Sequence, residues 1–306
     1  FVLIFKASGV FNFAQGVFAL FAALTLVGFQ TGQIPFSHLI NELFGTNLHN
    51  WYPSLHSFLA ILLTIVTMII LAWLVERLVL RHLVNQEPII LFMATIGLAF
   101  VLEGVGDLMW GSDVKVLDVG IPSGGSIWLE EATIGWASEG SEYYGMYIDV
   151  LNVWATIIAV ILVTALALFS QYTKTGRALR AVADDHQAAL SVGISLRSIW
   201  ILVWGISGFI AMVAGIMWGT ESGVQFSLSL IALKALPVLI LGGFTSIPGA
   251  IIGGLLIGVG EKLAEIYIGG LLDIGAIENW FAYVLALVFL LFRPQGLFGD
   301  KIIERV

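Results

Sequence analysis

Long apolar runs, separated by short polar stretches, constrain this chain more than any other feature of its sequence. Pro53–Val75, Pro88–Trp110 and Val150–Ser170 each approach the ~20 residues that a helix needs to cross a bilayer. A backbone inside lipid must satisfy its own hydrogen bonds, so such runs fold as helices. Only 11% of the residues are charged, whereas 59% are hydrophobic. The sequence therefore predicts an all-α, polytopic membrane helix bundle.

Further apolar runs bring the predicted number of full transmembrane helices to about eight. They are Gly16–Phe29, Ser198–Trp218, Val224–Gly243, Ala250–Ile268 and Ala276–Phe292. We also expect a truncated first helix that ends at Phe1–Phe5, with its missing part upstream. The polar stretch Asn12–Gly16 either breaks the following helix or lies inside a longer helix that begins near Ser8. Residues 1–306 are predicted to form a single transmembrane domain.

Two parts of the chain are weakly similar. Lys6 precedes the polar break at Asn12–Gly16, and Lys234 precedes Pro237 and the pair Gly242–Gly243. Related halves are common in transporters, so the similarity suggests a weak inverted repeat.

The loops differ sharply in charge. One set carries ten Lys and Arg residues, and the other carries only Lys115; the ten are Lys6, Arg77, Arg81, Lys174, Arg177, Arg180, Arg197, Arg293, Lys301 and Arg305. Because cytoplasmic loops carry the excess of positive charge, the central loop and the C-terminus are predicted to be cytoplasmic. Residues 111–149 are predicted to form an acidic periplasmic loop, which contains Asp113, Asp118, Glu130, Glu131, Glu139, Glu142 and Asp149.

The central loop, residues 171–197, has the pattern of short helices. Asp184, with Gln187 three residues later, has the spacing of a capping box. Gly193 stands where a left-handed residue ends a helix. These signals predict a two-turn helix over Asp185–Val192. So short a helix is marginal alone and must dock on something; the alternative is an ordinary interfacial loop helix.

The chain shows no pattern typical of an enzyme. It has no P-loop, no cysteine and no histidines at metal-ligand spacing, and no nucleophile–base arrangement is legible. We therefore expect no catalytic residue, no metal site and no cofactor. The acidic balance of the chain, with a net charge of −8, gives no reason to expect a nucleic-acid partner.

Polar groups inside the apolar runs are the candidates for a solute route. Asn12 and Gln15 are amides that either line a route or bond to a neighbouring helix. Lys234 either pairs with Glu103 or Glu261 or extends its amine to the interface. The glycines at 16, 242 and 243 are further candidates. Gly249–Gly253 and Gly254–Gly258 have the spacing that allows close helix packing, with shaping of a pathway or hinge as the alternative.

Several stretches resemble a known family. Gln187-Ala188-Ala189, three residues and then Gly193 resemble the Glu-Ala-Ala-x3-Gly loop of bacterial ABC-importer permeases, with Gln187 in place of the glutamate. GVFNFAQG, residues 9–16, is similar to the Asn-Phe-Ala-(His/Gln)-Gly signature of the branched-chain amino-acid permeases. TGRALRAVADDHQAALSVGI, residues 175–194, resembles the same group, and residues 292–299 resemble its Phe-Arg-Pro-x-Gly-Leu-Phe-Gly ending. The resemblance also extends over Lys6–Gly16 and Leu233–Gly260.

The resemblance implies an ABC-importer permease of the bacterial inner membrane, working by alternating access. Its expected partners are a second homologous permease, two cytoplasmic ATPases that bind the ATP, a periplasmic solute-binding protein and membrane lipid. The motion of the ATPases would pass through residues of the central loop: Arg177, Arg180, Asp184, Asp185, Ala188, Ala189 and Gly193. Branched-chain amino acids are the first substrate; urea or short amides, other amino acids and simple sugars are alternatives.

Two other functions fit the composition. An ion-coupled secondary transporter would use buried carboxylates, for which Glu103 and Glu261 are candidates. A structural membrane subunit of a larger complex would have no solute path. Copurifying ATPases would separate the importer from both.

Overall fold

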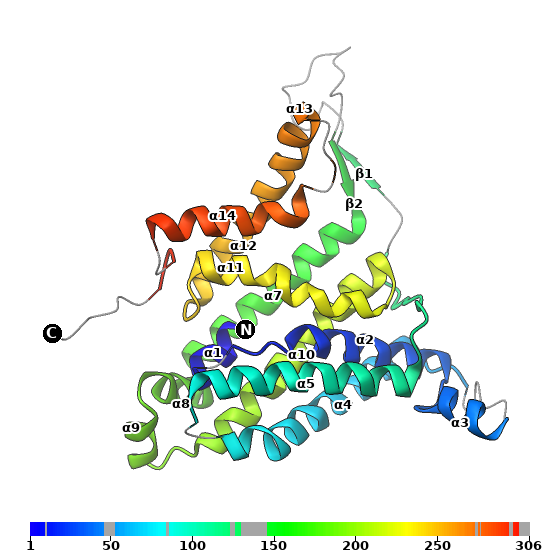
Figure 1. Cartoon of the computed structure of the whole chain (residues 1–306), viewed down its shortest axis with the longest axis horizontal. Coiled ribbons are helices and arrows are strands. Elements are labelled where there is room, and N and C mark those ends of the chain that lie inside the picture. The colour runs from blue at the N-terminus through cyan, green and yellow to red at the C-terminus, as the bar shows by residue number, and fades with distance from the viewer. Residues whose placement is uncertain are drawn as a thin grey trace.

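The computed structural model describes residues 1–9, 11–45, 53–83, 86–122, 126–129, 146–272, 275, 277–293 and 296–299. These form a helical bundle (Figure 1). The elements are α1 (Val2–Ser8), α2 (Gln15–Thr31), α3 (Ser37–Phe44), α4 (Ser57–Leu78), η1 (Leu80–Leu83), α5 (Pro88–Trp110), β1 (Ser126–Leu129), β2 (Met146–Asp149), α7 (Val150–Tyr172), α8 (Lys174–Asp184), α9 (His186–Ser191), α10 (Leu196–Ser222), η2 (Phe226–Leu230), α11 (Ile231–Gly242), α12 (Ile247–Ala264), η3 (Glu265–Gly269), α13 (Gly270–Leu272) and α14 (Glu278–Phe292).

The predicted all-α membrane bundle is confirmed. Within the described residues, five helices are long and apolar enough to cross a membrane, and three shorter apolar helices accompany them. The five are Ser57–Leu83, Ile89–Trp110, Val150–Tyr172, Leu196–Ser222 and Ile247–Gly269; the three are Gln15–Thr31, Phe226–Gly242 and Trp280–Phe292. The only strands in the described ranges form a small antiparallel hairpin, in which Ser126 pairs with Asp149 and Leu129 with Met146.

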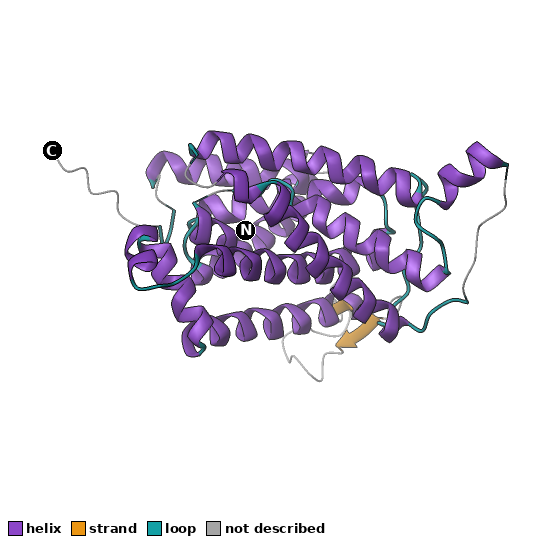
Figure 2. Cartoon of the chain, turned by 90° about the horizontal axis from the view of Figure 1, so that it is seen from below, coloured by secondary structure: helices purple, strands orange, loops and turns teal. Residues whose placement is uncertain are grey.

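The elements sort to two ends of the bundle. The helices α1, α8 and α9 and the C-terminal end of α14 lie at one end, at the left of Figure 1, which we call the α8–α9 end. The helix α3 and the β1–β2 hairpin lie at the other. Figure 2, a view from below, shows the long helices running between the two ends.

The helix boundaries follow the capping residues. The α5 helix begins with Pro88, as predicted, because its missing N–H is not needed in the first turn. The prediction that Pro53 opens the preceding helix is wrong: α4 begins at Ser57, since the His56 ring accepts a hydrogen bond from the Phe58 N–H at 3.4 Å. At its other end α4 continues to Leu78, which places Glu76 inside a helix rather than in a loop.

The first apolar segment is broken, which decides between the two alternatives for residues 8–16. The α1 helix ends at Gly9, which has a left-handed φ of 69°, and α2 begins only at Gln15. The predicted continuous span Val224–Gly243 is also broken, into η2 and α11. Val224 itself pairs with Lys115 through two backbone hydrogen bonds, so it belongs to a bridge at the end of the bundle.

Close helix contacts at glycines hold the centre together. A Cβ on Gly16 would collide with the Ser229 carbonyl of η2, and one on Gly215 would collide with the Ala19 carbonyl of α2. In the main core, the α10 helix packs against α2 and α4. The helices α11, α12 and α14 share a second core around Leu241. No residue in the most apolar part of α7 is buried within the chain. The flank of the bundle formed by α7 is therefore not covered by other helices of this chain.

Candidate functional site

The α8–α9 hairpin, residues 174–191, is built by its caps. The Thr173 hydroxyl accepts from the Gly176 N–H at 2.9 Å and starts α8. Gly176 allows this sharp turn, because a Cβ there would meet the Phe169 carbonyl at the end of α7. The α8 helix buries Leu179 and Val182 against the bundle. Its other face is basic and exposed, and it carries Lys174 and Arg177.

The α9 helix exists, but its N-cap is Asp185 rather than the predicted Asp184. The Asp185 carboxylate accepts from the N–H groups of Gln187 at 2.8 Å and Ala188 at 3.1 Å. Asp184 is the last residue of α8. The prediction slipped by one residue because adjacent aspartates offer the same capping chemistry and only the turn between the helices distinguishes them.

Gly193 ends α9 as predicted. Its φ is +87°, its N–H donates to the Leu190 carbonyl at 3.0 Å, and the Ile194 N–H donates to the Ala189 carbonyl at 3.0 Å. This pair of bonds is the Schellman motif. A Cβ on Gly193 would meet no atom within 4 Å, so the backbone conformation, not crowding, favours glycine here.

The tip of the hairpin exposes apolar side chains. Leu190 is 52% exposed and Val192 is 80% exposed, whereas Ala189 is buried at 3%. Ala188 and Asp185 are also exposed. These two exposed apolar side chains on an otherwise polar loop are candidates for contact with a protein partner. Neither Leu190 nor Val192 was among the predicted site residues; their apolar character in a polar loop was the available signal.

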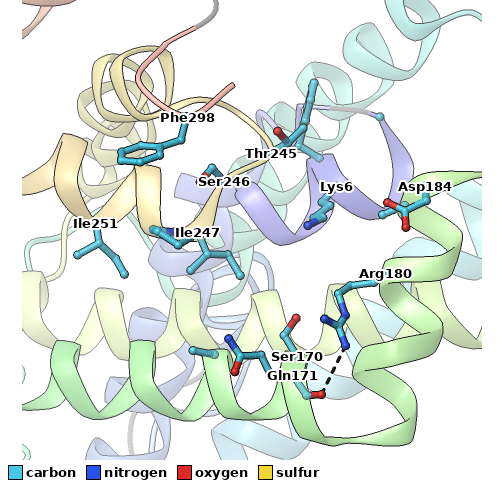
Figure 3. Close-up of a pocket in the computed structure, with 15 residues that line it drawn as sticks. Lys6, Ser170, Gln171, Arg180, Asp184, Thr245, Ser246, Ile247, Ile251 and Phe298 are labelled. Atoms are coloured by element: carbon cyan, nitrogen blue, oxygen red, sulfur yellow. Dashed lines mark hydrogen bonds between the residues drawn. The ribbon is translucent and has the colours of Figure 1, made fainter. Parts of the chain in front are cut away.

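A cavity of about 630 Å³ opens beside this hairpin (Figure 3). Lys6 reaches it from α1, and Arg180 and Asp184 reach it from α8. Thr245 and Ser246, in the turn between α11 and α12, line another wall. Two of the predicted coupling residues, Arg180 and Asp184, therefore face a cavity within the chain, while Arg177 faces outward. The Arg180 guanidinium also donates to the Gln171 carbonyl at 3.4 Å.

The C-terminal motif contributes one wall of the cavity. Gly296 has a φ of +76° and lies against Gly243, so the chain folds back after α14. The Leu297 N–H donates to the Leu241 carbonyl at 2.8 Å, and the Phe298 N–H donates to the Gly242 carbonyl at 3.2 Å. These bonds satisfy the free carbonyls at the end of α11. The Phe298 ring lines the cavity near Ser246 (Figure 3).

The two amides of the broken segment form a buried cluster with Ser207, which we call the amide cluster. The Asn12 amide donates to the Gln15 Oε1 at 3.0 Å, and the Ser207 hydroxyl donates to the same oxygen at 2.7 Å. The Gln15 amide donates to the Ser207 carbonyl of α10 at 3.0 Å. Asn12 is 0% exposed and Gln15 is 8% exposed. Of the two expected alternatives, the structure shows the second: Gln15 bonds to the neighbouring helix α10. A role of these amides in transport stays a prediction.

The other candidates for a solute route are scattered. Gly242 packs on Gly249, where a Cβ would meet backbone, and Gly243 has a φ of +101°. Gly249 and Gly253 do mediate the close approach of α12 to α11, as their spacing predicted. A Cβ on Gly258, by contrast, would meet no atom within 4 Å, so the second glycine pair makes no such contact in the described residues.

Lys234 is exposed in the first turns of α11. It lines a separate cavity of about 360 Å³ with Trp218, Gln225 and Tyr283. In the described part of the chain, Lys234 makes no ion pair with Glu103. Glu103 instead lines a third cavity, with Asp107, near the start of η2.

One polar contact was missed entirely. The Arg197 Nε lies 3.7 Å from the Glu76 carboxylate, which joins the start of α10 to the end of α4. The Glu76 side chain is 3% exposed and that of Arg197 is 51% exposed. Arg197 was expected in the central loop, and two residues 121 positions apart show no local pattern that would pair them.

Comparison with known proteins now decides the family. Residues 1–293 match the family model of the branched-chain amino acid transport system permease component. The chain belongs to this family. No solved structure matches it.

The chain is similar to named permeases along most of its length. It is 27% identical over 317 aligned residues to the high-affinity branched-chain amino acid transport system permease protein LivH of Escherichia coli (strain K12), which covers all of this chain and 91% of LivH. It is 30% identical to LivH of Salmonella typhimurium over 76% of this chain and 71% of that protein. BraD of Pseudomonas aeruginosa is 29% identical, with the same two coverages. The resemblance inferred from the motifs is confirmed.

The family motifs converge in space. The stretches that carried the resemblance supply Lys6 and Gly9, Arg180 and Asp184, the Thr245–Pro248 turn, and Phe298. All of them line the cavity beside the α8–α9 hairpin. The family is one of transport subunits rather than enzymes.

Proposed function

We propose that this chain is the membrane-spanning subunit of an ATP-driven importer of branched-chain amino acids, and that the α8–α9 hairpin docks on a cytoplasmic ATPase. The observation that carries the proposal is the exposed apolar tip at Leu190 and Val192, flanked by the basic face of α8. The relatives are permease components of branched-chain amino acid transport systems.

The distribution of charge supports a cytoplasmic α8–α9 end in the inner membrane of a bacterium. Most of the described Lys and Arg residues lie at that end: Lys6, Arg77, Arg81, Lys174, Arg177, Arg180, Arg197 and Arg293. Of the others, Lys115 lies in the loop after α5, and Lys234 and Lys262 lie within α11 and α12. Positive charge is retained on the cytoplasmic side. Residues 171–197 would then form the coupling loop, the C-terminus would be cytoplasmic, and residues 111–149 would form the periplasmic loop.

The family suggests the partners. Two ATPases would bind the ATP, so this chain would need no nucleotide site or cofactor of its own. A second homologous permease would complete the pore, and a periplasmic binding protein would deliver the solute. When the ATPases close, the α8–α9 hairpin would move with them and switch the pore between outward and inward access.

Copurification tests the docking surface. Replacement of both Leu190 and Val192 by Asp should reduce the ATPase recovered with the permease by ~tenfold or more, because buried apolar anchors dominate such interfaces. The control is Val116→Asp, which changes a valine that is 87% exposed and lies after α5. Membrane insertion should stay normal in both variants. Normal ATPase recovery with the double variant would refute the proposed surface.

A further inference from the structure

The cavity beside the α8–α9 hairpin combines charges of both signs with apolar walls. Lys6 and Arg180 supply two cations, and Asp184 supplies one carboxylate. The N-terminus of α12, capped by Ser246, also borders the cavity and adds the partial positive charge of a helix N-terminus. The positive groups therefore outnumber the single acidic one.

The apolar part of the wall is aliphatic and aromatic. Phe5, Ala167, Ile251 and Phe298 all line the cavity. A volume of about 630 Å³ is within the range of small-molecule sites, in which a few polar groups fix the orientation of the ligand. Polar and apolar groups share the lining of this cavity about equally. A ligand that matches this wall has an anionic group, a cationic group and a short apolar body.

We propose that this cavity binds a free α-amino acid with an aliphatic side chain, as the last binding site before the solute enters the cytoplasm. Its carboxylate faces Lys6, Arg180 and the α12 N-terminus, and its ammonium faces Asp184. The side chain packs on the apolar wall around Ile251 and Phe298. The inference deepens the proposed function, on which it rests.

The placement of the charges links this site to the motor. Arg180 and Asp184 lie on α8, whose exposed face begins the docking hairpin, whereas Lys6 lies on α1 and Ser246 precedes α12. Movement of α8 with the ATPase changes the distance between the two halves of the site. Release of the solute is thereby coupled to the position of the hairpin, and high cytoplasmic amino acid retains the inward-facing form by mass action.

A crossed ligand experiment tests the assignment. The permease complex is purified with its ATPases in a non-ionic detergent, without the binding protein, and calorimetry measures the binding of three ligands. Leucine carries both charged groups, 4-methylpentanoate lacks the amine, and 3-methylbutylamine lacks the carboxylate. Arg81→Gln is the control, because Arg81 is an exposed cation of η1 that lies outside the docking hairpin and does not line the cavity.

Each variant should weaken only the ligands that carry the matching group. Asp184→Asn should weaken leucine and 3-methylbutylamine by ~tenfold or more and leave 4-methylpentanoate unchanged, since a charge-assisted contact is lost. Lys6→Gln should weaken leucine and 4-methylpentanoate and leave the amine unchanged. Arg81→Gln should weaken none of the three ligands.

Two results would overturn the inference. One is the absence of leucine binding in a complex that still imports leucine, which would leave the proposed function intact. The other is leucine binding that neither Asp184→Asn nor Lys6→Gln alters. Failure of ATP-driven leucine uptake by the unaltered complex would instead refute the substrate of the proposed function itself.

Discussion

Replacement of Gln15 by Met separates two roles of the amide cluster. Methionine is similar in length and fits an apolar helix contact, but it cannot form the hydrogen bonds of the amide. Gln15 makes three of them: it accepts from Asn12 and Ser207 and donates to the Ser207 carbonyl. All three are buried. The variant therefore removes every bond that joins the broken segment to α10 through Gln15.

The expected loss of stability follows from these bonds. Side-chain hydrogen bonds within membranes contribute ~0.6 kcal/mol on average, and an orphaned buried amide adds ~1 kcal/mol or more. Three lost bonds and an unpaired Asn12 amide give about 2–3 kcal/mol for Gln15→Met. Ser207→Ala removes only the hydroxyl bond and should cost about 1 kcal/mol or less.

Tryptophan fluorescence during denaturant or thermal unfolding measures the effect, because the chain has 10 tryptophans. Leucine uptake per folded transporter is measured in parallel. The control is Gln86→Met, at an exposed loop position. If the cluster is structural, Gln15→Met lowers the unfolding midpoint and leaves the KM for uptake unchanged. An unchanged midpoint with a raised KM would refute this reasoning and assign the amide to the solute route.

Three further perturbations follow from the contacts. Gly16→Ala should destabilise strongly because its Cβ meets the backbone of η2, whereas Gly258→Ala should be neutral or stabilise by up to ~1 kcal/mol; unfolding midpoints compare them. Arg197→Gln should cost about 2–3 kcal/mol by leaving the Glu76 carboxylate buried without its partner, and adding Glu76→Gln should restore much of it, as a double-mutant cycle would show. Gly193→Ala should weaken α9 by ~1–2 kcal/mol through its positive φ and lower ATP-driven uptake while the amount of inserted protein stays normal.

Local sequence patterns predicted the helices well and their ends less well. The apolar runs identified every long helix, since lipid permits little else. The position where a helix begins depends on which of several neighbouring polar side chains accepts a hydrogen bond from a free backbone N–H of its first turn. At α4 this group is His56, so the helix begins at Ser57 rather than at the expected Pro53. At α9 it is Asp185 rather than Asp184.

Contacts between distant residues were beyond the reach of these patterns. Gln15 and Ser207 are 192 positions apart, and Gly16 meets Ser229. A single sequence shows that such residues are polar or small, but not which helix faces them. The cavity was partly foreseeable, because motifs from four stretches line it. Its position beside the hairpin could be seen only in the fold, which places Arg180 and Asp184 along the cavity and Arg177 on the exposed face of α8.

Polar side chains buried among the helices differ from those near the helix ends: the former are hydrogen-bonded within the chain, and some of the latter line cavities. This difference constrains where a solute route can run. Several buried polar side chains within the helices are hydrogen-bonded inside the chain: Thr25 and Thr64 donate to the carbonyls four residues before them, and the amide cluster is bonded internally. An unpaired polar group in lipid is costly, so polar side chains can face open space only where water or a partner reaches them. Arg180 and Lys234 do so near the ends of helices, in separate cavities. We therefore expect the middle of the route to run between this chain and a second permease, with this chain's own charges acting at its two ends.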